Sequence, residues 1–311
     1  MPAPVPLEVF PTRDDQVAAF ARETLGLSGI VDVHVHLLPD RLQEAVWGFF
    51  DRLEDPPWPI TYREDETTRL ATLRGLGVVA HTALAYGHKP GVAAWCNDHT
   101  LAAADRHPQI VPTFTFHAED DAAEYVADAI ARGGRAAKVH LQVGRFHATD
   151  PHLDDVWPQL AAARIPAVVH ASAVYGVDGG GEYCGPDAIR ALLDRHPDVT
   201  VVVAHLGAPD VEGFVTLAEQ APTLRLDTAM VLTDPPYLAD VPEELLDRVR
   251  GLADRLLFGS DFPTIPHAYA AQVRGLARLE LDRNALRGVF HHHAAHLLGL
   301  DDDATGEEGA T

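Results

Sequence analysis

The chain has 311 residues, of which 47% are hydrophobic, enough for one large domain with a sizeable core. Its formal net charge of −22 argues against nucleic acid and anionic membranes as partners, because both bind through Lys and Arg, and leaves a small molecule as the expected partner. Two cysteines without a Cys-x-x-Cys motif, no signal peptide and no apolar run of about 18–20 residues indicate a reduced, cytoplasmic setting.

Short apolar runs alternate with amphipathic segments along most of the chain. The runs are rich in β-branched residues, which is typical of buried strands, and several of the amphipathic segments end at glycine, which is typical of helices. Strands are expected at 30–36, 78–84, 110–116, 135–141, 166–170, 199–205, 223–228 and 255–261. Helices are expected at 64–76, 91–106, 120–132, 153–164, 186–195, 211–220, 242–253, 267–279 and 282–298.

Eight strands alternating with helices predict an α/β fold, a TIM-like (β/α)8 barrel at 30–300 that ends in C-terminal helices. A doubly wound open sheet is the alternative, but no Gly-x-Gly-x-x-Gly follows the first strand. Residues 1–29 are expected to form a short N-terminal extension with a helix at 14–25. Residues 37–62 are expected to be a long aromatic loop that either covers a substrate or packs as a hydrophobic loop. Residues 301–311 are expected to be an acidic, disordered tail.

Polar side chains stand at the ends of the expected strands, where a barrel of this kind places its catalytic groups. His34 and His36 project from one face of the first strand, because side chains alternate along a strand. The other polar residues at strand ends are Lys138, His140, His170, His205 and Asp261. Imidazoles and a carboxylate suit Zn²⁺, with Mn²⁺ and Fe²⁺ as alternatives. The pattern therefore predicts a metal site.

In order and spacing, these motifs resemble the amidohydrolase superfamily. The resemblance covers roughly residues 28–300 and rests on Val33-His34-Val35-His36, Val169-His170, Ala204-His205-Leu206-Gly207 and Gly259-Ser260-Asp261-Phe262-Pro263. Segments 259–263 and 293–300 look most like the branch that contains aminocarboxymuconate semialdehyde decarboxylase and related hydrolases. That branch often has Asn-Ala where this chain has His293-Ala294, so the closing helix matches it less well.

The resemblance implies that His34, His36, His170 and Asp261 bind the metal. His205 and Asp261 would be catalytic, orienting the water at the metal or removing its proton. In binuclear members of the superfamily, a carboxylated lysine at the position of Lys138 bridges two metals. We favour one metal, with two if Lys138 is carboxylated; otherwise this lysine neutralises a substrate carboxylate or pairs with an acid such as Asp227.

The predicted activity is that of a metal-dependent hydrolase, in which metal-activated water attacks an amide, lactone or ester carbonyl. The first alternative is non-oxidative decarboxylation of a small unsaturated or aromatic carboxylic acid, for which Arg145 or Lys138 would supply a cation. The second alternative is a non-catalytic binding barrel. Arg145 and Tyr175, in the loops after the fourth and fifth strands, are candidates for binding a substrate anion. Dimers are frequent among similar proteins, so a homodimer is the oligomer to test.

Overall fold

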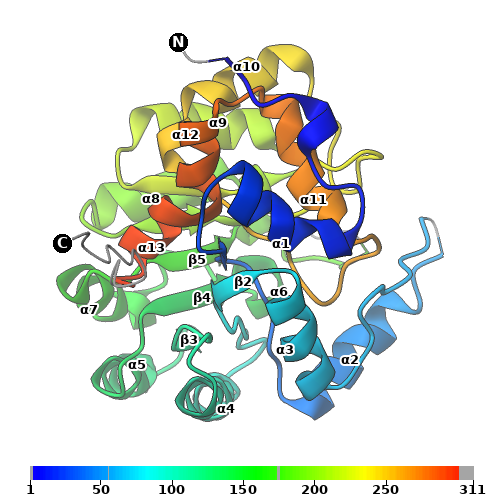
Figure 1. Ribbon diagram of the computed structural model, residues 1–311. Coiled ribbons are helices and arrows are strands. Elements are labelled where there is room, and N and C mark those ends of the chain that lie inside the picture. Colours follow the sequence, from blue (N-terminus) through cyan, green and yellow to red (C-terminus); the bar gives the residue numbers. More distant parts are fainter. Residues whose placement is uncertain (1–2, 55, 174–175, 301–311) are drawn as a thin grey trace, which may run out of the picture.

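Eight short strands run through the centre of the computed structural model, which describes residues 3–54, 56–173 and 176–300 (Figure 1). All the strand pairs are parallel. The strands are β1 Ile30–Asp32, β2 Val78–His81, β3 Thr113–Thr115, β4 Ala136–His140, β5 Ala167–His170, β6 Val201–Val203, β7 Leu224–Asp227 and β8 Leu256–Leu257.

Hydrogen bonds join these strands into a closed barrel. Strands β1 and β2 form one sheet, and β3 to β8 form a second sheet in chain order. Parallel bridges link the two sheets at both gaps, between His81 and Ile110 on one side and between Val35 and Phe262 on the other. The expected (β/α)8 barrel is thus confirmed, with strands shorter than the apolar runs that encode them.

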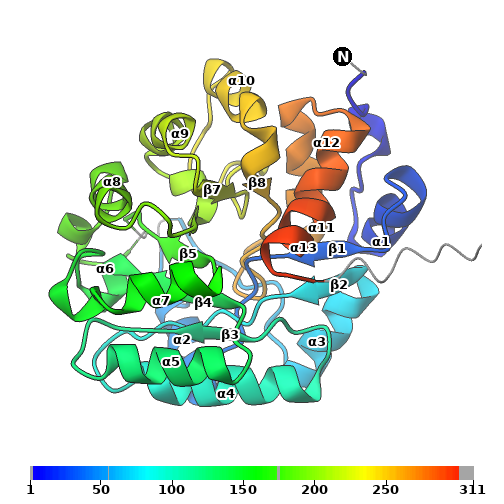
Figure 2. The same cartoon turned by 90° about the vertical axis from the view of Figure 1, so that its left-hand side faces the viewer.

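Helices surround the barrel in chain order, from α3 to α10, as Figure 2 shows. The larger helices are α2 Asp40–Phe50, α3 Glu66–Gly75, α4 Ala93–Arg106, α5 Ala122–Ala131, α7 Val156–Ala163, α8 Pro186–Arg195, α9 Val211–Gln220, α10 Glu243–Gly251 and α11 Tyr269–Gly275. The shorter ones are α1 Val17–Ala19, α6 Leu141–Gly144, α12 Arg283–Arg287 and α13 His293–Leu297. Among the described residues, no helix has the length and hydropathy needed to cross a bilayer.

Helices α3 and α9 begin where an aspartate caps an amphipathic run. Asp65 accepts a hydrogen bond from the backbone of Thr68 at 2.8 Å and begins α3, and Asp210 begins α9 by the same contact to Gly213 at 3.0 Å. Their apolar stripes pack on strands that are buried on both faces. Trp157 of α7 is fully buried and lies edge-on to Phe116, with ring centroids 5.2 Å apart. The core therefore lies between the barrel and its ring of helices.

Segment 37–62 differs from the expected loop, because residues 40–50 form helix α2. The prolines that suggested a loop, Pro56, Pro57 and Pro59, all lie after the helix has ended. A second unexpected helix, α6, begins directly at the end of β4. The predicted disordered tail at 301–311 lies outside the described residues.

The N-terminal segment packs along the outside of the barrel beside α11 and α12 (Figure 1). Phe20 contacts Phe10 and Phe290, with ring centroids 4.9 and 5.9 Å away, so the extension shares an aromatic cluster with the end of the chain. The backbone of Val5 donates a hydrogen bond to Leu281 O at 3.0 Å. These contacts fix residues 3–25 against the segment that carries the last strand and helices.

Candidate metal centre

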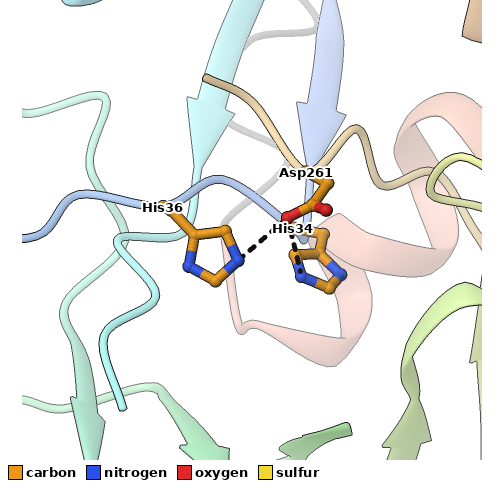
Figure 3. A group of neighbouring side chains, drawn as sticks. All are labelled: His34, His36 and Asp261. Carbon is orange, nitrogen blue, oxygen red and sulfur yellow. Dashed lines mark ion pairs between the residues drawn. The ribbon is translucent and has the colours of Figure 1, made fainter. Parts of the chain in front are cut away.

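His34, His36 and Asp261 come together at one end of the barrel, where Asp261 lies beside both rings (Figure 3). Asp261 Oδ1 lies 2.9 Å from His36 Nε2 and 3.6 Å from His34 Nε2. One ligand atom from each of the three residues lies within 4.8 Å of those of the other two. The structure thus brings together three of the five residues that the sequence predicts as metal ligands.

The chain after β8 is shaped to bring Asp261 to the histidines. Gly259 lies against His34, and a Cβ on this glycine would stand 2.7 Å from His34 Cβ, closer than two carbons can pack. Asp261 has a left-handed backbone, with φ of 62°, and its N–H donates to His34 O at 2.7 Å. The glycine and the turn explain why this Gly-Ser-Asp segment can meet strand β1.

Each of the three histidines near Asp261 has its Nδ1 occupied by a fixed acceptor. His34 Nδ1 donates to Asp227 Oδ2 at 2.8 Å, His36 Nδ1 to Leu84 O at 3.0 Å, and His205 Nδ1 to Ala229 O at 3.0 Å. In the neutral ring, the lone pair is then on Nε2. The acceptors thus select the tautomer that can bind a metal.

The geometry around Asp261 calls for a cation. The Nε2 lone pairs of His34 and His36 and the carboxylate oxygen of Asp261 are all acceptors, and acceptors in contact repel unless a metal or a proton lies between them. His34 Nε2 is buried and has no hydrogen-bond partner among the described residues. Burial lowers the pKa of His34 to about 4, so this ring is neutral near pH 7. The donor set therefore fits a divalent transition metal.

His205 and Asp227 form a second group that shares His34. The rings of His34 and His205 are 4.7 Å apart between centroids. Asp227 Oδ1 accepts hydrogen bonds from the backbone N–H groups of His205 at 2.8 Å and Ala229 at 3.1 Å. Because both Asp227 oxygens are thus occupied, this residue orients the histidines rather than offering a free ligand atom.

His170 lies in the same cavity but belongs to neither group. It pairs in register with His140 across β4 and β5, and the two rings stack with centroids 4.0 Å apart. Its centroid is 5.0 Å from that of His205. Burial lowers the pKa of both stacked rings well below the usual value, which favours the neutral, metal-binding form.

Lys138 is fully buried in the wall of β4. Its Nζ has no hydrogen-bond partner among the described residues, so the expected pairing with Asp227 does not occur as a direct hydrogen bond. Burial lowers its pKa to about 8, although the charges of Asp227 and Asp261 act in the opposite direction. A buried ammonium without a hydrogen bond is costly, so this lysine can bind a partner that the described residues do not supply.

These residues form the floor of a cavity of about 480 Å³. The floor is polar, with His36, Lys138, His170, His205 and Asp261. The walls are largely apolar and come from α2, α6 and the segments after β2 and β5; they include Leu42, Val46, Phe49, Tyr86, Val143 and Val177. The volume is in the range of about 300–1,000 Å³ that is usual for small-molecule sites.

Asp32, which is not among the predicted site residues, also supports the site. Its Oδ1 accepts from the backbone N–H groups of His34 at 3.0 Å and Ser260 at 3.1 Å, and its Oδ2 accepts from Tyr269 at 2.8 Å. One buried carboxylate therefore holds together the two segments that carry the candidate ligands. A signal was present: Asp32 shares a strand face with His34 and His36, in an otherwise apolar run.

Comparison with known proteins agrees with this geometry. The family described as Amidohydrolase matches residues 31–300. No curated protein matches the chain.

Solved structures share the fold at low sequence identity. An uncharacterized TIM-barrel protein from Bordetella bronchiseptica has a TM-score of 0.70 and 19% identity, over 87% of this chain and 98% of that one. The 5-carboxyvanillate decarboxylase LigW from Sphingomonas paucimobilis has a TM-score of 0.63 and 17% identity, over 88% and 99%. Apo IDCase from Metarhizium anisopliae has a TM-score of 0.55 and 15% identity, over 90% and 100%. Since the family match spans the whole barrel and its strand-end residues, the chain belongs to the amidohydrolase family.

Proposed function

We propose that the chain is a metal-dependent hydrolase that cleaves an amide, lactone or ester of a small molecule. The observation that carries the proposal is the meeting of acceptor atoms from His34, His36 and Asp261, of which His36 and Asp261 line the cavity. These residues would hold the metal, which is Zn²⁺ in the first instance, with Mn²⁺ or Fe²⁺ as alternatives. His170 would join them from β5, and Lys138 would do so only if it is carboxylated.

When bound, the metal supplies Lewis acidity, which acidifies a water and polarises a carbonyl. The chain's own residues then handle the protons. His205 Nε2 is the unprotonated nitrogen of its ring and can accept the proton that water loses as its oxygen attacks the carbonyl carbon. The same nitrogen returns that proton to the leaving nitrogen or oxygen as its bond to the carbonyl carbon breaks. Ala229 O holds the Nδ1 proton of His205 throughout.

Decarboxylation is the second candidate, and one observation favours it. Two cations, Lys138 and Arg145, line the same cavity and could hold the carboxylate of an acid. LigW, whose name is that of a decarboxylase, shares the barrel fold. We rank hydrolysis first because His205 and Asp261 provide the acceptor for a water proton that hydrolysis requires and decarboxylation does not.

Metal content and product analysis together test the proposal. Wild type, Lys138→Ala and Asp261→Asn are purified without chelator, and metal per chain is measured by mass spectrometry. We expect about one metal in wild type and Lys138→Ala and almost none in Asp261→Asn. About two metals that fall to one in Lys138→Ala would instead indicate a carboxylated, bridging lysine.

Products are then measured with a panel of esters, lactones, amides and aromatic acids. Hydrolysis that is lost in Asp261→Asn supports the proposal. Release of CO₂ from the acids, without hydrolysis of the other compounds, would assign the site to decarboxylation. No metal in wild type after reconstitution with Zn²⁺ and Mn²⁺ would overturn the metal site and leave a binding barrel.

A further inference from the structure

The rim of the cavity holds an arginine in a fixed position. Arg145 ends helix α6 in a left-handed conformation, with φ of 55°, and its N–H donates to Leu141 O at 2.9 Å. Its guanidinium lines the cavity, and Nη2 donates to Asp178 O at 3.2 Å. A left-handed non-glycine residue is uncommon, and here it is a residue that lines the cavity.

Neighbouring contacts hold this rim of the cavity in place. Gln142 Nε2 donates to Val177 O at 3.3 Å and to Gly179 O at 2.9 Å, which joins α6 to the segment after β5. Gly180 packs so closely that a Cβ there would stand 2.5 Å from Gln142 O. The hydrogen bond from Arg145 Nη2 to Asp178 O is a third contact between α6 and this segment. The guanidinium therefore lies where α6 and the segment after β5 are joined by hydrogen bonds.

Arg145 has no acidic partner among the described residues. No carboxylate oxygen of the described residues lies within 4.0 Å of its guanidinium. Other arginines on the outside of the molecule, such as Arg132, Arg195 and Arg248, are paired with carboxylates. The chain has 46 acidic and 24 basic residues, so an unpaired cation facing a cavity is not explained by a shortage of acids. Apart from the N–H that Nη2 donates to Asp178 O, its donors can bind a ligand.

Opposite the polar floor, helix α2 presents an apolar face to the cavity. Leu42, Val46 and Phe49 follow helical spacing, line the cavity, and are only half-buried by the protein. Val177, in the segment after β5, lines the same cavity. A ligand that covered these side chains would remove apolar surface from water, at about 25 cal/mol per Å².

We propose that the substrate is an amphipathic carboxylate: Arg145 binds its carboxylate at the rim, and its apolar body lies against α2. This inference rests on the proposed function, because the scissile carbonyl is then the part that reaches His205 and Asp261. A planar guanidinium matches a carboxylate through two parallel hydrogen bonds. A doubly charged phosphate fits less well, since Asp178 and Asp261 also line the cavity.

Calorimetric binding of two probes tests the charge requirement. The probes are 4-phenylbutyrate and the neutral 4-phenylbutanol, measured after incubation with Zn²⁺ for wild type, Arg145→Gln, Arg145→Lys and Arg190→Gln. Arg190 lies on the exposed side of α8 and contacts Gln220, so it is the matched control. We expect wild type and Arg190→Gln to prefer the acid at least about tenfold, which corresponds to roughly 1.4 kcal/mol.

Arg145→Gln should lose most of that preference, Arg145→Lys should keep part of it, and binding of the alcohol should change less than about twofold in both. Equal binding of the acid to wild type and Arg145→Gln would overturn the inference, including the case in which the metal or Lys138 holds the carboxylate. So would equal binding of acid and alcohol to wild type.

A second variant tests the apolar half of the inference. Phe49→Ala should weaken 4-phenylbutyrate several-fold and leave acetate unaffected, because only the longer acid reaches α2. Trp95→Ala removes an exposed aromatic ring from α4 and serves as the control. Equal loss for both acids, or loss for neither, would contradict the assignment of α2.

The two proposals fail in distinguishable ways. A chain that holds metal and hydrolyses esters, but ignores the charge of the probe, refutes the substrate class alone. A chain that binds the acid through Arg145, but holds no metal after reconstitution, refutes the proposed hydrolysis and keeps the anion site.

Discussion

At the scale of single residues, Asp227 controls the orientation of two candidate site histidines. One of its oxygens accepts from His34 Nδ1, and the other accepts from the backbone of His205 and Ala229. In Asp227→Asn, an amide NH₂ group replaces one of the two carboxylate oxygens. This donor would then face another donor, either His34 Nδ1–H or the backbone N–H groups of His205 and Ala229. We expect metal affinity to fall about 10–100-fold, as is usual when the partner of a ligating histidine is lost.

Competition with a chromogenic chelator measures this effect. Asp187→Asn is the matched control, because Asp187 is an exposed residue in the first turn of α8. Unchanged metal affinity in Asp227→Asn would show that His34 is held by other contacts, or that it is not a ligand.

The residues of the site differ in how far the sequence alone reveals them. His34, His36 and Asp261 could be predicted to meet, because strand ends in a barrel share one mouth and alternation fixes the side-chain face. The stacking of His170 on His140 follows from the register of β4 and β5, which no local pattern encodes. Asp32 was missed because its role is to accept backbone N–H groups, and this leaves no motif of its own.

At the scale of elements, the turn after β6 depends on a glycine. Gly207 has φ of +79°, and a Cβ there would stand 1.9 Å from Cδ2 of the buried Phe214. Gly207→Ala combines a left-handed backbone with a clash in a closely packed site. We expect the free energy of unfolding to fall by about 2–5 kcal/mol, measured by urea denaturation.

Gly251→Ala provides the comparison within the same chain. Gly251 ends α10 and has open space around the position of a Cβ, so its replacement should be neutral or slightly stabilising. Similar losses in both variants would mean that the turn after β6 adapts to the extra methyl group.

Helix α2 shows where reading elements from sequence fails. The prolines of segment 37–62 predict a loop because proline breaks helices, yet all of them between α2 and residue 62 lie beyond residue 50. Helix α2 nonetheless lines the cavity. The aromatic residues of this segment thus predict a position near the substrate, while its prolines lead to the wrong secondary structure.

The N-terminal extension should contribute measurably to stability through Asp14. Its Oδ1 accepts from the backbone of Ala270 at 2.9 Å, and its Oδ2 accepts from Tyr62, which in turn accepts from the backbone of Tyr269 at 2.6 Å. Asp14→Ala leaves these donors without acceptors, so we expect a loss of about 1–3 kcal/mol in the free energy of unfolding.

The neighbouring Asp15→Ala is the control for this variant. Asp15 is exposed, Arg13 is its one charged partner among the described residues, and an exposed pair of this kind contributes about 0–1 kcal/mol. If both variants unfold at the same denaturant concentration, Asp14 does not anchor the extension.

At the scale of the whole molecule, the barrel could be predicted because its signal is repeated. Eight apolar runs alternate with amphipathic segments, and errors at single boundaries do not change the count. Closure itself depends on isolated bridges at His81 and Val35, in stretches where regular strand pairing has already ended. Sequence periodicity does not report such contacts, so the strand limits were too long while the architecture was right.

The candidate metal centre also links the first and last strands of the barrel, so metal binding should stabilise the entire fold. His34 and His36 follow β1, whereas Asp261 follows β8, and a metal bound by all three would cross the seam where the barrel closes. A ligand present at about 100 times its dissociation constant stabilises a folded protein by about 2.7 kcal/mol. We therefore expect Zn²⁺ to raise Tm by about 4 °C over chelator-treated protein in thermal scans. In Asp261→Asn, the same addition should change Tm by less than about 1 °C, because the carboxylate that joins the two sides is gone. A similar rise in both proteins would place the bound metal elsewhere, for instance on the exposed histidines of the last helices.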